Sequence, residues 1–473
     1  MNVAPSPLNP DWLDQIRPAM RAVATSGILE VFNYGRGRQG LIPLWVGEGD
    51  LPTPPFICEA AKASLDRGET FYTYQRGVPE LRAAIAAYMT RVYGAAPGGG
   101  AFSPENFFVT IGGMHAIEIA TRLIVGPGDE ALIPSPAWPN FVGALEISGA
   151  RAVPVRLDRT SRWSLDPDKL ASAVTPATRL IFFNTPANPT GFVATREEIA
   201  ATLAIARRHG LWIIADEIYG RLTYDGARAP SFHDVMAPDD KILFVQTLSK
   251  NWAMTGFRVG WLEAPPALGD VIENLVQFTT SGVPVFTQRA ATAALDQGEE
   301  FLAWQIDRCR RSRDILCEGL KATGRVRFSE PEAAFYLFCS VDGFADSRAL
   351  ALSLIDEAGV GAAPGGAFGP GGEGHLRLCF ARDPDQIADA TRRMANWLKR
   401  CPGSGSAPRP PPAALRPMLH WRTSLWRRSR LAFKFRAKGQ EITCSLARAE
   451  ASSTCPAPTP RPWPRPRPCP PMR

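Results

Sequence analysis

Apolar and polar positions follow two different rhythms along the chain. Between residues 107 and 263, short β-branched or apolar runs alternate with segments of helical length and periodicity. The pattern predicts strands at 107–111, 131–133, 152–155, 180–184, 211–216, 242–247 and 259–262, with helices between them that include 114–125, 141–148 and 195–209. This alternation is typical of an α/β domain with a mostly parallel sheet, which binds ligands at the carboxyl ends of its strands.

After residue 263 the pattern changes. Long helices are predicted at 267–279, 299–322 and 383–400, with strands at 326–328, 334–338 and 375–380. These elements indicate a smaller α+β domain. We therefore expect an N-terminal arm that belongs partly to the small domain (1–45), a large α/β domain (46–284), the small α+β domain (285–400) and a tail (401–473).

The tail differs from the rest of the chain in composition and charge. The net charge is +7, but residues 401–473 contain fourteen Lys or Arg and two acidic residues, so the tail carries +12 and residues 1–400 carry −5. Its Pro- and Arg-rich composition predicts disorder. It is interpreted either as a non-functional extension, such as out-of-frame translation of GC-rich sequence, or as a basic arm for nucleic acid or an anionic surface. Because no aromatic or Gly-rich periodicity accompanies the charge, no nucleic-acid partner is expected.

The composition as a whole is that of an ordinary globular protein, with 45% hydrophobic and 21% charged residues. The N-terminus lacks the basic and apolar regions of a secretion signal, and no run of about 18 apolar residues occurs, so we expect a cytoplasmic protein without membrane contact. The five cysteines before residue 401 have no metal-binding spacing. Reduced, buried thiols are expected there rather than a metal site.

One lysine occupies an unusual place in this pattern. The segment QTLSKNWAMTGFRVG (246–260) puts Lys250 and several hydroxyl groups after the strand 242–247, with Arg258 eight residues later. A buried amine near cations has a lowered pKa and can form imines with carbonyl compounds. Taken alone, a Ser-Lys pair more often belongs to a solvated surface.

Other polar residues follow neighbouring strands. Asp216 ends the apolar strand 211–216 and Tyr219 follows three residues later, while Asn188 lies in the turn-rich segment NTPANPTG (184–191). Each also has a structural interpretation, because Asp216 suits a helix cap and 184–191 a rigid loop.

A Gly-Gly turn at 112–113 closes one strand and opens a helix, whose N-terminus suits a phosphate. An ordinary strand-to-helix turn explains it equally well. Trp138, in the run PAWPN, suits either the face of a flat ring or the protein core.

In their order and spacing, these motifs resemble the class I/II aminotransferases of fold type I, the aspartate aminotransferase superfamily, over roughly residues 27–400. The resemblance implies pyridoxal 5'-phosphate (PLP) as cofactor, held as a Schiff base by the residue matching Lys250, which also moves the substrate proton. It implies that Asp216 pairs with the pyridine nitrogen, so that the ring acts as an electron sink. The matches to Tyr219 and Asn188 hydrogen-bond the phenolic oxygen.

The same resemblance assigns residues to the cofactor's phosphate and ring. The backbone amides of Gly113 and Met114 form the phosphate cup with Ser249 and Arg258. Thr247 supplies a supporting hydroxyl, and Trp138 matches the aromatic residue that stacks on the ring.

Two further motifs imply shared active sites and a carboxylate site. The run FYTYQRGVPELR (71–82) resembles the element in which the match to Tyr72 reaches the phosphate of the neighbouring subunit, so a homodimer is implied. Gly47, in VGEGD, and Arg377, in GHLRLCFA, match residues that contact the substrate carboxylate, with Trp138 and Asn188 beside them. A guanidinium fork pairs with a carboxylate through two parallel hydrogen bonds.

The implied activity moves an amino group between an L-amino acid and a 2-oxo acid, as part of biosynthetic amino acid metabolism. Met114 stands where one aspartate-using subgroup has lysine, and no second arginine for a distal carboxylate is evident. Aromatic, branched or small neutral donors therefore stay open, with 2-oxoglutarate or pyruvate as acceptor. The alternatives are a PLP-dependent lyase on the same fold, by carbon–sulfur β-elimination or cyclisation like that of aminocyclopropane-carboxylate synthases, and a non-catalytic binding protein.

Overall fold

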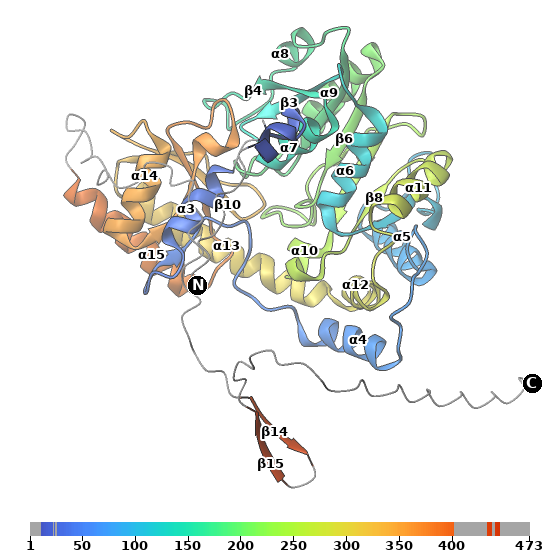
Figure 1. Cartoon of the computed structure of the whole chain (residues 1–473). Helices are drawn as coiled ribbons and strands as arrows, with labels where there is room; N and C mark the ends of the chain where they lie inside the picture. Colours follow the sequence, from blue (N-terminus) through green and yellow to red (C-terminus); the bar gives the residue numbers. More distant parts are fainter. Residues whose placement is uncertain (1–10, 22, 24–25, 402–432, 438–439, 445–473) are drawn as a thin grey trace, which may run out of the picture. The chain divides into compact units, whose positions relative to one another are not determined.

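The computed structural model describes residues 11–21, 23, 26–401, 433–437 and 440–444. A seven-stranded sheet forms the centre of its larger part (Figure 1). The strands, in the spatial order β2-β8-β7-β6-β5-β3-β4, are β2 (Phe107–Thr110), β3 (Glu130–Ser135), β4 (Arg151–Arg156), β5 (Thr178–Asn184), β6 (Trp212–Asp216), β7 (Ile242–Thr247) and β8 (Gly260–Glu263). Neighbours among β3 to β7 pair in parallel, and β8 runs antiparallel to β2 and β7. The expected mostly parallel α/β sheet is confirmed.

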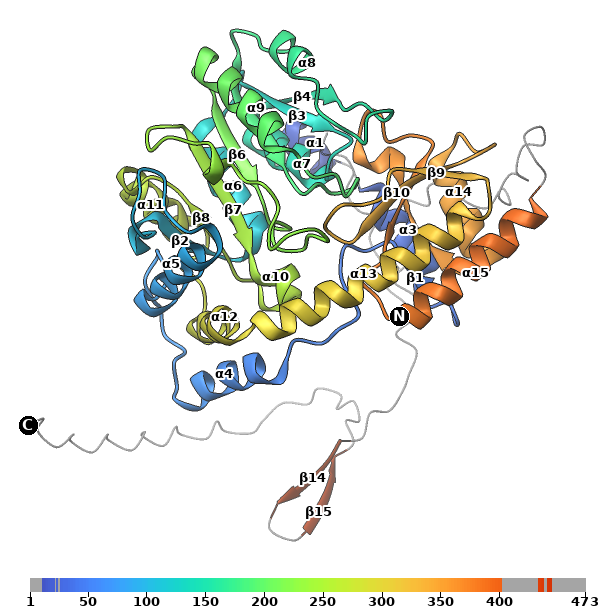
Figure 2. The ribbon, with the colours of Figure 1, turned by 180° about the vertical axis from the view of Figure 1, so that it is seen from behind.

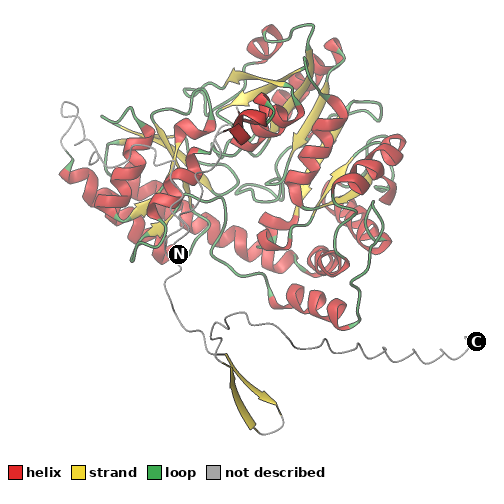
Figure 3. Cartoon of the chain, viewed as in Figure 1, coloured by secondary structure: helices red, strands yellow, loops and turns green. Residues whose placement is uncertain are grey.

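Helices cover both faces of this sheet (Figure 3). Side chains of the central strands alternate between two apolar clusters: Ile213 and Phe244 point into one, Ile214 and Leu243 into the other. The second cluster is closed by α6 (Gly112–Ile124), α7 (Pro139–Ser148) and α11 (Gly269–Thr279), and the first by α5 (Pro79–Tyr93), α8 (Pro167–Ser172) and α9 (Arg196–His209). Burial on both faces explains why these strands are apolar without a break.

A second, smaller sheet has the antiparallel order β12-β13-β10-β9. Its strands are β9 (Val326–Phe328), β10 (Tyr336–Val341), β12 (Ala363–Pro364) and β13 (His375–Cys379), and its helices are α14 (Ser347–Ser353) and α15 (Pro384–Arg400), with a π-helical turn at Leu354–Ala358. The long helix α13 (Glu299–Lys321) runs from the large sheet's side of the molecule to α15 (Figure 2). The domain boundaries at 45, 284 and 400 stay predictions.

The N-terminal part packs on the smaller sheet. Helix α3 (Gly27–Gly35) contacts α14 and β12, and β1 (Ile42–Pro43) pairs in parallel with β11 (Val360–Gly361). The short helices α1 (Asp11–Gln15) and α2 (Pro18–Arg21) precede α3.

The structure contains elements that the sequence pattern does not predict, and one predicted strand is shifted. The additional helices include α4 (Pro55–Asp66), α5 and α12 (Val285–Gln297), and α12 packs on α4 and α5. The buried face of α12 is mostly alanine, which gives little apolar periodicity. Strand β10 begins two residues later than predicted, because Ala334 has a φ of +57° and donates its N–H to Leu222 O (2.8 Å) outside the sheet.

The chain divides into two compact units, at 1–411 and 412–473. In the second unit the structure describes one antiparallel pair, β14 (Phe433–Ala437) with β15 (Gln440–Cys444). The rest of the 401–473 tail lies outside the described residues, so its predicted disorder stays a prediction. Within the described part of the chain, no helix is long and apolar enough to cross a membrane.

Candidate active site

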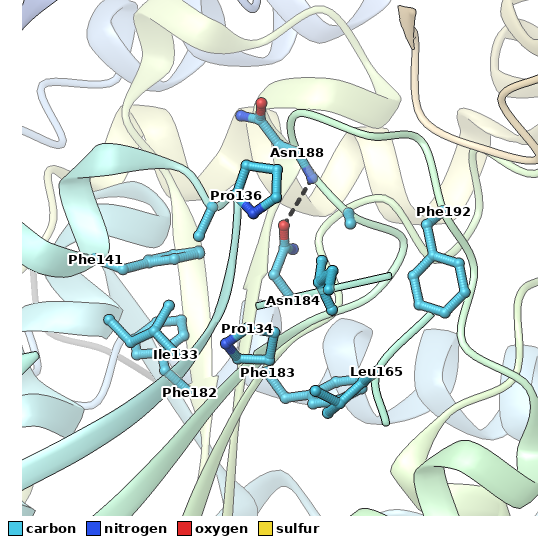
Figure 4. Close-up of a pocket in the computed structure, with 13 residues that line it drawn as sticks. Ile133, Pro134, Pro136, Phe141, Leu165, Phe182, Phe183, Asn184, Asn188 and Phe192 are labelled. Carbon is cyan, nitrogen blue, oxygen red and sulfur yellow. Dashed lines mark hydrogen bonds between the residues drawn. The ribbon is translucent and has the colours of Figure 1, made fainter. Parts of the chain in front are cut away.

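A small cavity of about 20 Å³ lies beneath the loop that follows β5 (Figure 4). Its lining is apolar except for Asn184 and Asn188. The backbone N–H of Asn188 donates a hydrogen bond to the side-chain Oδ1 of Asn184 (2.8 Å). A cavity of this size holds about one water molecule. It is therefore a packing space that lies under the 184–191 loop.

A second cavity, of about 370 Å³, has the size of a small-molecule site. It lies where β5 and β6 end in Asn184 and Asp216, and Lys250 follows the end of β7. Its lining residues are Ser26, Ile28, Leu29, Phe32, Val46, Gly47, Trp138, Asn140, Phe141, Asn184, Asn188, Asp216, Ile218, Tyr219, Lys250, Tyr336 and Arg377. The carboxyl edge of the parallel strands thus carries the site, as the sequence predicts.

Lys250 lies on the four-residue helix α10 (Leu248–Asn251), directly after β7. Thr247 caps this helix by accepting a hydrogen bond from Ser249 N–H (3.2 Å), and Lys250 Nζ donates to Gly47 O (2.8 Å). Burial lowers the pKa of Lys250 to about 8, and the positive charges of Arg377 and Arg258 also lower it. Near neutral pH a much larger fraction of this amine than of an ordinary lysine is therefore uncharged and nucleophilic.

Asp216 and Tyr219 lie on the floor of the cavity, and both are buried. Ile218 N–H donates to Asp216 Oδ1 (3.3 Å), but burial raises the pKa of Asp216 to about 7. Tyr219 Oη and Tyr336 Oη share a hydrogen bond (2.8 Å), and burial raises the pKa of the Tyr219 hydroxyl well above its usual value. The floor combines an acid that needs a cationic partner with two neutral phenols.

Arg377 reaches the cavity from β13 and is buried. Its Nη1 donates to Asn188 Oδ1 (3.0 Å) and its Nη2 to Trp45 O (2.5 Å), while its Cζ lies 4.6 Å from the ring centre of Tyr336. Its Nε is buried and has no partner. A buried guanidinium with an unused N–H is stabilised by an anion, which supplies both the missing hydrogen-bond acceptor and the opposite charge.

The residues predicted for the phosphate cup lie close to one another. Helix α6 begins at Gly112 with no side-chain cap, which leaves its first backbone N–H groups free for a ligand. The hydroxyls of Thr247 and Ser249 lie 2.9 Å apart, and Arg258 has a left-handed backbone (φ +52°). A Cβ at Gly112 would lie 2.6 Å from Arg258 Nη2, so the guanidinium packs directly on the turn.

These features fit a flat cofactor that carries a phosphate and a basic ring nitrogen. The helix end and Arg258 suit the phosphate, the buried Asp216 suits the nitrogen, and Trp138 lines the cavity with an aromatic face held edge-on by Phe141 (ring centres 5.4 Å apart). PLP has this chemistry.

Of the predicted site residues, the cavity lining includes Gly47, Trp138, Asn188, Asp216, Tyr219, Lys250 and Arg377, and it does not include Gly113, Met114, Thr247, Ser249, Arg258 and Tyr72. The role of each stays a prediction. Tyr72 is 93% exposed and lies outside the cavity of its own chain. Sequence reasoning missed Tyr336, Val46 and the α3 residues Ile28, Leu29 and Phe32. Tyr336 belongs to an almost wholly buried strand, where nothing in the apolar pattern distinguishes a functional hydroxyl.

Comparison with known proteins agrees with this geometry. Residues 39–394 match the family described as "Aminotransferase class I and II". The chain is similar to an aspartate aminotransferase of Pyrococcus horikoshii (32% identical over 386 residues, 80% of this chain and 95% of that protein) and to aromatic-amino-acid aminotransferase 2 of Thermococcus litoralis (33% over 398 residues, 82% and 98%).

Among solved structures, it resembles the aspartate aminotransferase of Thermus thermophilus with maleate, with a TM-score of 0.74, 32% identity, and 80% of this chain and 99% of that chain covered. These likenesses favour transamination over the lyase and binding-protein alternatives. The chain belongs to the class I and II aminotransferases of fold type I and is a PLP-dependent aminotransferase.

Proposed function

We propose that the 370 Å³ cavity is the site of amino-group transfer between an L-amino acid and a 2-oxo acid, and that Lys250 is its catalytic base and cofactor-binding residue. The observation that carries this proposal is the position of Lys250 Nζ, whose pKa is lowered to about 8, in one cavity with Asp216 and Arg377. A general base works best when its pKa lies near the working pH.

PLP, when bound, supplies an electron sink that stabilises negative charge at the substrate Cα. The uncharged Lys250 Nζ would take the proton from the Cα of the amino donor and, in the second half of the exchange, would deliver a proton to the Cα of the amino acceptor. Ionised Asp216 is stabilised once a cationic ring nitrogen faces it, which offsets the cost of its burial. Tyr219, held by Tyr336, and Asn188 supply hydrogen bonds to the phenolic oxygen.

Arg377 binds the α-carboxylate of the substrate. Asn188 and Trp45 O hold its Nη atoms, and the rings of Tyr336 and Phe368 lie 4.6 and 4.9 Å from its Cζ, so the fork has little rotational freedom. Its unpaired Nε–H is the group that would donate a hydrogen bond to a carboxylate oxygen of the substrate. Gly47 is constrained in the same region, because a Cβ there would lie 2.5 Å from Tyr336 Oη.

A homodimer with shared active sites also belongs to this proposal. Tyr72, Phe71 and Phe278 are all more than 80% exposed, which is unusual for large aromatic side chains of a monomer. A second copy that covers them would bring Tyr72 to the phosphate cup of its neighbour. A cytoplasmic location and a biosynthetic role stay predictions.

The test is the visible absorption of protein reconstituted with PLP, before and after single amino acids are added without an acceptor. Wild-type protein is expected to show a visible band that amino donors convert to a near-ultraviolet band. Lys250→Ala should lack the band, whereas Lys241→Ala, at an exposed position directly before β7, should keep it. A normal band in Lys250→Ala would refute the role of this lysine.

A further inference from the structure

The part of the cavity formed by α3 is apolar. Ile28, Leu29 and Phe32 line the cavity, and their spacing of one and four residues places them on one face of the helix. Glu30 lies on the other face, where it pairs with Arg348. Leu29 is 54% exposed although it lines the cavity, so an apolar ligand would remove this side chain from water.

This apolar wall is fixed in place by Trp45. The Trp45 ring packs edge-on against Phe32 (ring centres 5.8 Å apart), and it fills the space beside Gly35 and Gly361, where an added Cβ would lie 2.4 and 2.0 Å from ring atoms. The Trp45 carbonyl accepts a hydrogen bond from Arg377. One residue therefore sets the distance between the carboxylate-binding arginine and the wall formed by α3.

The described residues of this chain that line the cavity supply no counter-charge for a second carboxylate. Among the described residues that line it, the side chains other than tyrosines that can carry a charge are Asp216, Lys250 and Arg377. Arg377 serves one carboxylate, and Lys250 is the reacting amine. Met114, at the start of α6, offers Asn140 only a thioether (3.7 Å). A buried carboxylate without a counter-charge is costly.

We propose that this protein selects amino donors with large apolar side chains, aromatic or branched aliphatic, over dicarboxylic amino acids, and that Ile28, Leu29 and Phe32 determine this choice. The inference rests on the proposed function, because it assumes that Arg377 holds the α-carboxylate. The same wall receives the side chain of the acceptor, so pyruvate or an apolar 2-oxo acid is favoured over 2-oxoglutarate.

Binding of unreactive carboxylates tests the proposal without turnover. Calorimetric titration of the PLP-loaded protein is expected to give at least about tenfold tighter binding for 3-phenylpropionate than for succinate. Succinate binding that equals or exceeds that of 3-phenylpropionate would overturn the proposal.

Single-turnover rates with phenylalanine, leucine, alanine, aspartate and glutamate form the second test. The value of kcat/KM for phenylalanine and leucine is expected to exceed that for aspartate by roughly 100-fold. Equal or higher values for the acidic donors overturn the proposed donor class. If no donor reacts, the proposed function fails, and the titration still decides the preference of the cavity.

Two variants test whether α3 determines the preference for apolar over acidic amino donors. Leu29→Arg should raise the aspartate-to-phenylalanine ratio of kcat/KM at least about tenfold, by supplying a counter-charge. Ile147→Arg, at a 47% exposed position of α7 outside the cavity lining, is the control and should leave the ratio unchanged.

Phe32→Ala should lower kcat/KM for phenylalanine at least about tenfold more than it lowers the value for alanine, whose methyl group does not reach the wall. Retained alanine turnover shows that the variant is folded. Unchanged donor ratios in both α3 variants would overturn the role of the helix.

Discussion

Asp216 is a single side chain whose burial conflicts with its charge in the ligand-free protein. Because burial raises its pKa to about 7, from an ordinary value of 3.8, the native state holds this proton to higher pH than the unfolded state does. Stability is then lost as the pH rises from about 4 through 7. Asp216→Asn should therefore raise the thermal midpoint of the PLP-free protein more at pH 8 than at pH 5, with the difference between the two pH values worth about 1–3 kcal/mol.

Asp240 provides the control of opposite sign. Its carboxylate accepts hydrogen bonds from Arg207 Nε (2.7 Å) and Ala237 N–H (2.7 Å), and although burial opposes it, the net effect lowers its pKa. Asp240→Asn should therefore destabilise the protein at pH 8. A lower midpoint for Asp216→Asn at pH 8 would show that its ionised form is already compensated without cofactor.

The pKa of Lys250 leads to a second prediction at this scale. The uncharged fraction of an amine rises with pH and levels off above its pKa, which for Lys250 is about 8 against 10.5 for an ordinary lysine. The rate at which PLP-free protein combines with PLP, followed by visible absorption between pH 6 and 10, should rise and then level off near pH 8. A rate that still climbs in proportion to hydroxide at pH 10 would contradict the lowered pKa.

At the residue scale, the sequence predicts groups with distinctive chemistry better than groups that blend into the core. Lys250, Asp216 and Asn188 each lie at the end of an apolar strand or shortly after it, where a polar residue contrasts with its neighbours. Tyr336 and Trp45 do not contrast, since both stand in buried segments rich in apolar residues. Their roles depend on contacts with residues over 100 positions away, which no local pattern encodes.

Among the elements, the contact between β11 and the segment after β1 is sensitive to added volume. Gly361→Ala would place a Cβ 2.0 Å from Trp45 Cε3 and must displace the ring. We expect a loss of about 1–3 kcal/mol in the free energy of unfolding. Weaker binding of 3-phenylpropionate should accompany it, because Trp45 O positions Arg377.

Thermal unfolding and calorimetry check both effects. Gly126→Ala is the matched control, since no atom lies within 4 Å of the added Cβ, and its effect should stay within about 0.5 kcal/mol. If Gly361→Ala lowers stability but leaves carboxylate binding unchanged, Trp45 does not position Arg377 for binding.

The order of strands and helices from 107 to 263 could be predicted because burial on both faces gives each parallel strand an apolar run of its own. Helix α12 could not, because small alanines fill its contact with α4 and α5 where larger residues would show a period. The antiparallel pairing of β8 with β2 and β7 could not be predicted either, because it depends on how the chain connects these strands and not on the local pattern of apolar residues.

For the whole molecule, the proposed dimer makes a prediction about mixed subunits. Tyr72→Ala and Lys250→Ala should each impair the homodimer, the first through the phosphate of the neighbour and the second through its own site. A mixed dimer of the two variants contains one site with both residues intact. Random mixing of equal amounts should therefore restore roughly a quarter of wild-type activity.

Activity measured before and after the two purified variants are unfolded and refolded together checks this, with each variant refolded alone as the control. Mixtures no more active than the average of the two separate preparations would place Tyr72 outside the site.

The apolar face of α3 has a consequence for how this enzyme could be redesigned. The groups proposed for chemistry are spread from Gly47 to Arg377, whereas Ile28, Leu29 and Phe32 lie within five consecutive residues (28–32) near the N-terminus. Replacing one short, contiguous stretch of the gene would therefore alter substrate preference and leave the catalytic apparatus untouched. Libraries that vary these three positions, with Gly35, Trp45 and Gly361 held constant, offer a compact route to new donors.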